Sequence, residues 1–244
     1  MSVGLEWPLQ GRKKGISMKL RILVAAFFLL SSVGFAGTVT YDNSSLVNSS
    51  ISPFGSPADE STSTYGETFA APGGTSTVLN NFSLFLDPGP ISGQLEGYIG
   101  TWTGSQAGSL LYTSAPVTVT GNFQQFTFNT GGLSLTPGAE YIAFLSISGP
   151  GYAGFQGNTS MPTVSGGGTI PGGTMVWFNN GADASLLTNT TWDGYNAFGM
   201  SLDAQFVADF NTSGASATPE PGSLVLFGSG IVGLIGMARR KFNL

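Results

Sequence analysis

Acidic side chains are the main groups with which this 244-residue chain could perform acid–base or metal chemistry. The sequence has no Cys and no His, and its eight Lys and Arg residues all lie before Ile22 or after Ala238. Without these residue types, the segment between Gly37 and Thr218 cannot form a Ser–His–Asp or Cys–His arrangement, a Lys nucleophile or an Arg clamp. A typical zinc site would lack its usual ligands. The same segment contains eleven acidic residues: Asp42, Asp59, Glu60, Glu67, Asp87, Glu96, Glu140, Asp183, Asp193, Asp203 and Asp209.

Two kinds of carboxylate chemistry remain open. Two carboxylates could hydrolyse a glycoside if they stood roughly 5 to 9.5 Å apart. The adjacent Asp59 and Glu60 would point in opposite directions if extended and lie in a predicted loop, so solvated acids are the favoured interpretation. Calcium is the more credible ligand, because the stretches 179–183 and 193–196 offer Asn and Asp oxygens. Ordinary turn formation by Asn, Asp and Gly is the simpler explanation of both. We expect no catalytic site, no metal site and no cofactor, with calcium kept as the one candidate.

Aromatic residues could bind sugar rings, whose C–H faces pack on aromatic planes. Trp192 is the best candidate because it lies in the polar stretch 179–196, and Tyr195 follows it closely. A position in the hydrophobic core is the alternative for both. The missing cations exclude salt bridges within the segment 37–218 and argue against nucleic acid, whose phosphates are bound by Lys and Arg. Neutral glycans and divalent cations are the partners that suit an acidic surface.

The C-terminal end has three parts in a fixed order. Pro219, Glu220 and Pro221 come first, then residues 222–238 without an ionisable side chain, and then Arg239, Arg240 and Lys241. A helix over 222–238 would just reach across a hydrocarbon core of roughly 30 Å. The three cations would remain beside the cytoplasmic headgroups and retain the chain in the membrane. An ordinary tail anchor with a chance Pro-Glu-Pro sequence is the alternative.

The N-terminal end predicts a secretion signal over residues 18–36. Lys19 and Arg21 precede an apolar run from Ile22 to Leu30, and the small residues before Ala36 favour cleavage between Ala36 and Gly37. This apolar core is too short for a membrane anchor. Residues 1–17 add only a polar and basic extension that is not expected in the native protein, so Met18 is a better start than Met1.

The C-terminal order of parts resembles the PEP-CTERM sorting signal of Gram-negative bacteria. The resemblance covers about a tenth of the chain. It implies recognition of Pro219, Glu220 and Pro221 by an exosortase, and membrane retention by Arg239, Arg240 and Lys241. It further implies export, a transient inner-membrane anchor and delivery to the cell surface or extracellular matrix, with signal peptidase and exosortase as processing partners.

The segment 37–210 is predicted to be an all-β ectodomain, joined by a linker over 211–218 to the sorting segment 219–244. It has many Gly, Ser, Thr and Asn residues and no convincing helix pattern, which suits short strands and turns. We expect the stretch 42–66 to be mainly a loop, and the Gly-rich stretch 164–174 to be a mobile loop. Alternation and turn signals predict strands over 38–41, 67–71, 76–86, 94–102, 109–112, 117–129, 139–148, 175–178 and 198–206.

This series of strands favours an antiparallel two-sheet sandwich, with a jelly roll preferred over an immunoglobulin-like order. Residues 65–207 loosely resemble jelly-roll modules found beside such sorting tails, through Thr68-Phe69, the stretch Leu135 to Tyr141 and the last strand. Those modules are similar to carbohydrate-binding modules, but the resemblance assigns no site residues. The main hypothesis is a non-enzymatic structural or surface protein. The alternative is a module that binds exopolysaccharide and is stabilised by calcium.

Overall fold

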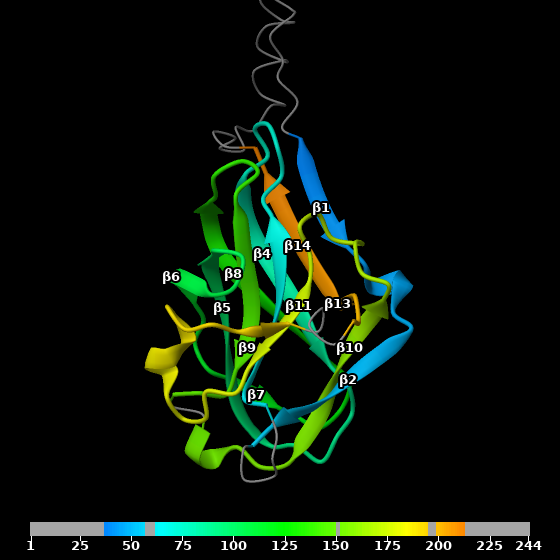
Figure 1. Cartoon of the computed structure of the whole chain (residues 1–244), viewed down its shortest axis with the longest axis vertical. Helices are drawn as coiled ribbons and strands as arrows, with labels where there is room; N and C mark the ends of the chain where they lie inside the picture. Colours follow the sequence, from blue (N-terminus) through cyan, green and yellow to red (C-terminus); the bar gives the residue numbers. More distant parts are fainter. Residues whose placement is uncertain (1–36, 57–61, 150–151, 195–198, 213–244) are drawn as a thin grey trace, which may run out of the picture. The chain divides into compact units, whose positions relative to one another are not determined.

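The structure of the protein is a computed structural model that describes residues 37–56, 62–149, 152–194 and 199–212 (Figure 1). These residues form antiparallel β-strands with short 3-10 segments η1 (Ser44–Leu46), η3 (Tyr152–Gly154) and η4 (Ala184–Leu187). The all-β prediction is therefore confirmed. No helix within the described ranges is long and apolar enough to cross a membrane. The predicted signal peptide, membrane helix and sorting motif lie outside the described residues.

One layer of the sandwich is made of two adjoining sheets. The first has the strand order β1-β14-β4-β8, and the second has the order β13-β10-β2. Their strands are β1 (Thr38–Asp42), β2 (Ser49–Gly55), β4 (Val78–Leu86), β8 (Gln124–Ser134), β10 (Asn158–Ser165), β13 (Leu202–Ala204) and β14 (Phe206–Asn211). Only Gln205 separates β13 from β14, and its amide donates to the carbonyl of Pro162 at 2.8 Å. This bond joins the two sheets at the start of β14.

The opposite layer is one larger sheet, ordered β12-β11-β3-β9-β5-β6, with β7 pairing to β5. Its strands are β3 (Thr64–Ala70), β5 (Gly93–Trp102), β6 (Ala107–Thr113), β7 (Val117–Val119), β9 (Glu140–Ser146), β11 (Met175–Phe178) and β12 (Asp193–Gly194). All pairs of these named strands in both layers are antiparallel. From β3 to β5 the chain crosses from one layer to the other with each strand.

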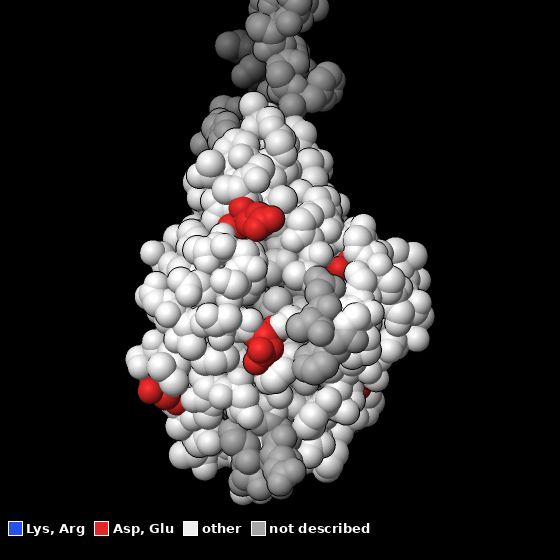
Figure 2. Space-filling model, viewed as in Figure 1, with Lys and Arg blue, Asp and Glu red and all other residues white. Residues whose placement is uncertain are grey.

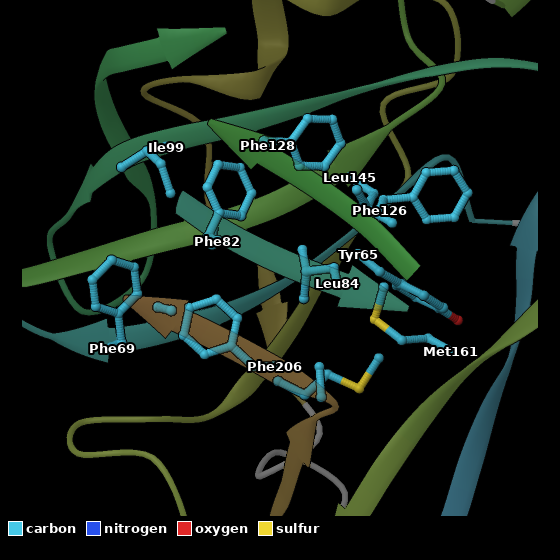
Figure 3. Close-up of a cluster of buried hydrophobic side chains, with 14 of the residues drawn as sticks. Tyr65, Phe69, Phe82, Leu84, Ile99, Phe126, Phe128, Leu145, Met161 and Phe206 are labelled. Atoms are coloured by element: carbon cyan, nitrogen blue, oxygen red, sulfur yellow. The ribbon is translucent and has the colours of Figure 1, made fainter. Parts of the chain in front are cut away.

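The main core lies between the layers, as Figure 3 shows. Phe206 on β14 and Phe69 on β3 come from opposite layers, and their ring centroids are 5.6 Å apart. Strand β9 contributes to both of its faces, because Leu145 joins the main core whereas Phe144 joins a second hydrophobic cluster. Since successive strand residues point to opposite sides, this second cluster lies on the outer face of the larger sheet. Strand β9 is therefore apolar on both faces.

Several predicted strand bounds are wrong. The single strand expected over 117–129 is divided into β7 and β8, and Gly121 in the connection has φ of +74°. The loop expected over 42–66 contains β2, and the beginning of the loop expected over 164–174 belongs to β10. In the last predicted strand, Leu202, Ala204 and Phe206 are buried, but Asp203 and Gln205 between them are buried too and Met200 is 42% exposed, so burial does not follow the expected alternation. That strand breaks at Gln205 and continues to Asn211.

Candidate functional site

Trp192, the candidate sugar-binding residue, is buried in the second hydrophobic cluster. Its side chain is only 4% exposed, and its Nε1 donates to the carbonyl of Leu187 at 3.3 Å. The indole lies edge-on to Phe144 at 5.0 Å and stacks on Phe178 at 5.8 Å, measured between ring centroids. This position favours the core alternative over sugar stacking, because the packed ring faces cannot receive a ligand. Tyr195 lies outside the described residues.

The loop that covers this cluster is fixed by its own polar side chains. Asn180 accepts hydrogen bonds from Ser63 and Thr64, each 2.9 Å from its Oδ1, and donates through Nδ2 to the carbonyl of Asp183. Asp183 accepts from the side chain and amide of Ser185 at the start of η4, and these hydrogen bonds lower the pKa of the Asp183 carboxyl. This loop is one of the two stretches considered for calcium. Its Asn and Asp side-chain oxygens instead accept hydrogen bonds that hold the turn and cap η4.

The second stretch considered for calcium is only partly described. Asp193 is exposed and belongs to β12, where it pairs with Trp177. Tyr195 and Asn196 lie outside the described residues, as do Asp59 and Glu60, the adjacent carboxylates considered for glycoside hydrolysis. Among the described residues, no group of three or more His, Cys, Asp or Glu side chains could hold a metal ion.

A pair of buried carboxyl groups is the most unusual polar feature of the sandwich interior. Glu67 and Asp203 both have an exposed fraction of 0%. Glu67 lies on β3 between Tyr65 and Phe69, and the period of a strand places all three side chains on the face that carries the main core. Asp203 lies on β13, across the sandwich from β3. These two acids were not predicted to differ from the other nine of the segment 37–218.

One oxygen of each carboxyl group is hydrogen-bonded to the main chain. Glu67 Oε2 accepts from the amide of Ala204 at 2.7 Å. Asp203 Oδ2 accepts from the amide and hydroxyl of Thr169, at 2.7 and 2.5 Å, and from the amide of Ile170 at 3.4 Å. The other two oxygens, Glu67 Oε1 and Asp203 Oδ1, are buried and have no hydrogen-bond partner among the described residues.

The electrostatics of the pair follow from this burial. Burial raises the pKa of Glu67 well above its usual value, the neighbouring Asp203 carboxylate raises it further, and the hydrogen bond from Ala204 lowers it in part. No Lys, Arg or His side chain exists between residues 22 and 238 to neutralise either group. Figure 2 shows the same imbalance at the surface, where isolated acidic side chains lie on a face without Lys or Arg.

The buried pair also fixes the Gly-rich loop over 166–174. Asp203 holds the amides of Thr169 and Ile170, and Ile170 is itself only 2% exposed. The Thr68 hydroxyl donates to the carbonyl of Gly172 at 2.9 Å, and the amide of Ala70 donates to the carbonyl of Pro171 at 2.6 Å. The loop that was predicted to be mobile is thus anchored to both layers.

The C-terminal segment is identified by comparison with known families. Residues 217–241 match the family model described as the PEP-CTERM protein-sorting motif. The match contains the Pro-Glu-Pro sequence, the apolar run and all three C-terminal cations, which lie outside the described residues. No curated protein matches the chain.

Two of the solved structures that are similar to this chain are structures of Cwp84. The crystal structure of the cysteine protease and lectin-like domains of Cwp84, a surface layer associated protein of Clostridium difficile, has 11% identity and a TM-score of 0.41 over 62% of this chain and 32% of that one. A clostridial Cwp84 cysteine protease after propeptide cleavage has 14% identity and a TM-score of 0.46 over 72% and 40%. This chain therefore spans about a third of the length of the first structure. Neither likeness is close enough to support a functional argument. The firm identification is that this chain carries a PEP-CTERM protein-sorting motif at residues 217–241.

Proposed function

We propose that this protein is an exported structural or surface protein whose C-terminal segment directs it to the cell envelope and extracellular matrix. The match of residues 217–241 to the sorting motif carries the proposal, because this motif implies processing by an exosortase. The predicted signal peptide over 18–36 supplies the matching export signal at the other end. The crossing of successive strands between layers supports a jelly-roll organisation of the exported domain.

A structural role without catalysis suits the chemistry of the domain. The segment 37–218 has no Cys, His, Lys or Arg, so a Ser–His–Asp, Cys–His or Lys-based nucleophile cannot form within it and carboxylates are the remaining acid–base groups. Among the described residues, the neighbouring carboxyl groups of Glu67 and Asp203 are fully buried and lack access to a polysaccharide. We therefore propose that the protein acts without catalysis, through the surface of its folded domain once that domain has been delivered to the envelope.

The proposal is tested by replacing Pro219, Glu220 and Pro221 with Ala and fractionating the producing cells. We expect the wild type to lose its C-terminal tail and leave the inner membrane, whereas the variant should keep the tail and accumulate there. A matched control carries Ala at Thr212, Ser213 and Ser216, just before the motif. Normal processing and location of the Pro-Glu-Pro variant would refute the sorting role.

Carbohydrate binding is the second candidate, and partly exposed aromatic residues favour it. Trp102 at the end of β5 and Phe178 at the end of β11 are half-buried at the margin of the cluster around Trp192. Rings at such a margin could pack on a sugar. Binding of the full-length protein, purified in detergent, to an array of exopolysaccharides should weaken on Trp102→Ala. The control Phe123→Ala removes an exposed aromatic ring elsewhere. Absence of saturable binding by the wild type would exclude this role.

A further inference from the structure

Two buried carboxylate oxygens in the interior of the sandwich lack a partner. Glu67 Oε1 and Asp203 Oδ1 belong to side chains with an exposed fraction of 0%, and neither has a hydrogen bond within the described part of the chain. Burial of an unsatisfied polar atom is costly, and burial of an unpaired charge costs far more. A fold that retains two such oxygens is therefore stabilised by a cation or a proton that neutralises them.

Main-chain amides reach one oxygen of each carboxyl group and leave the other oxygen without a partner among the described residues. Main-chain amides of Thr169 and Ile170 donate to Asp203, and the amide of Ala204 donates to Glu67. At Glu67 the Ala204 amide offsets only part of the rise in pKa that burial and the neighbouring Asp203 cause. No Lys, Arg or His lies between residues 22 and 238, so no side chain of that segment can supply a positive charge.

We propose that Glu67 and Asp203 bind one Ca²⁺ ion in the interior of the sandwich, through Oε1 of Glu67 and Oδ1 of Asp203. Calcium takes six to eight oxygen ligands and readily includes main-chain carbonyl groups. This composition suits a site with two carboxylates and a surrounding loop. Magnesium suits it less, because Mg²⁺ usually keeps several of its water molecules.

The Gly-rich loop supplies main-chain oxygen close to Glu67. A Cβ atom placed on Gly173 would lie 2.7 Å from Glu67 Oε1 and 2.8 Å from the carbonyl oxygen of Ile170. Because Gly173 has no side chain, Glu67 Oε1 and the carbonyl oxygen of Ile170 can both lie close to its backbone. Calcium would tie together β3, β13 and this loop, which are distant in sequence. The inference does not depend on the proposed sorting or on the surface role.

The test uses the full-length protein, purified in detergent and freed of metal with EGTA. Isothermal titration calorimetry with Ca²⁺ should show one saturable site, and Mg²⁺ should bind at least about tenfold more weakly. A free Ca²⁺ concentration about a hundred times Kd should raise Tm by about 5 to 10 °C. Absence of saturable Ca²⁺ binding by the wild type would overturn the proposal without any variant.

Variants locate the site. Glu67→Gln and Asp203→Asn keep the size of each side chain and remove one negative charge, so each should weaken Ca²⁺ binding at least about tenfold. Asp193→Asn is the matched control, because Asp193 is an exposed acid in a stretch whose composition suggests calcium. Its Kd should equal that of the wild type. Loss of binding in Asp193→Asn alone would place the ion in that exposed loop and overturn the buried site.

A shared proton is the competing way to neutralise the pair. In that case the wild-type protein would show neither Ca²⁺ binding nor a Ca²⁺-dependent Tm, and Glu67→Gln would be as stable as the wild type or more so at neutral pH. These results together would show that a proton, and not Ca²⁺, neutralises the two carboxyl groups. A wild-type Tm that rises with Ca²⁺ but not with Mg²⁺, and a rise that is lost in Glu67→Gln, would support the cation.

Discussion

A single tryptophan illustrates how the polar sequence around a residue can hide its burial. Trp192 follows a run of Asn, Thr, Asp and Ser, which indicates exposure, yet its ring is enclosed by Phe144, Phe178 and Trp102. The polar neighbours face outward or hold the turn together, so their composition describes the loop and not the position of the indole. The indole is buried by contacts between β5, β9, β11 and this loop. The residues that make these contacts are far apart in the sequence.

We predict that Trp192→Ala lowers the free energy of unfolding by about 3 to 5 kcal/mol, because it leaves a large cavity in the second hydrophobic cluster. Chemical denaturation followed by circular dichroism measures this loss. The conservative Trp192→Phe should retain much of the stability, since an aromatic ring still fills the space. An unchanged denaturation midpoint in Trp192→Ala would indicate that the indole is not packed in the core.

Gly173 is a second residue whose role comes from its surroundings. A methyl group at this position would lie 2.7 Å from both Glu67 Oε1 and the Cβ of Ile170. We predict that Gly173→Ala destabilises the protein by about 1 to 3 kcal/mol through overpacking, measured by urea denaturation. Gly73→Ala is the matched control, because a Cβ there would meet no atom within 4 Å. Equal stabilities of the two variants would contradict the close packing around the buried carboxyl pair.

Strands with regular alternation are the elements that sequence predicts well. Strand β11 has the predicted bounds, and β1, β4, β5 and β9 lie close to theirs. Strands β2 and β10 were not predicted, because each contains a Pro and several Ser or Asn residues that also characterise loops. These two segments become strands because they pair with each other, not because of their composition. The pairing joins residues about a hundred positions apart.

The same limit applies to the candidate site. The sequence shows that the segment 37–218 has eleven acids and no Lys or Arg, so no ion pair between two side chains of that segment can form. It cannot show that Glu67 and Asp203 are the two acids that meet, since β3 and β13 belong to opposite layers. A clue was present in β3, where Glu67 shares an inward face with Tyr65 and Phe69.

Strand β5 carries a tyrosine whose ionisation should affect alkaline stability. Burial and a hydrogen bond to Glu96 raise the pKa of Tyr98 above its usual value of 10.0. Above about pH 10 the unfolded chain loses this proton while the folded protein keeps it, so stability should fall as pH rises towards the raised pKa. Urea denaturation between pH 9 and 11 measures this fall. Tyr98→Phe should reduce the slope, whereas the control Tyr152→Phe removes a phenol elsewhere; identical slopes in all three proteins would contradict the prediction.

On the scale of the whole molecule, the export signals predict the ends of the mature protein. Cleavage between Ala36 and Gly37 would leave a chain that begins one residue before β1. Intact-mass and N-terminal analysis of the exported protein should therefore give Gly37 as the first residue. Ala36→Asp should block this cleavage, because signal peptidase needs a small residue before the cut. Recovery of an exported protein that still contains residues 18–36 would contradict this assignment.

The pairing of β1 with β14 has a consequence for the timing of secretion. The first strand of the domain and the last are neighbours, with Thr38 opposite Asn211, and β14 also pairs with β4. A polypeptide threaded outward from its N-terminus delivers β4 more than a hundred residues before β14, so one edge of β4 stays unsealed for most of translocation. Pro219 follows Asn211 by only eight positions. If the chain is exported as proposed, completion of the sheet and arrival of the sorting motif at the envelope would be nearly simultaneous, and the processing enzyme would meet a newly folded domain.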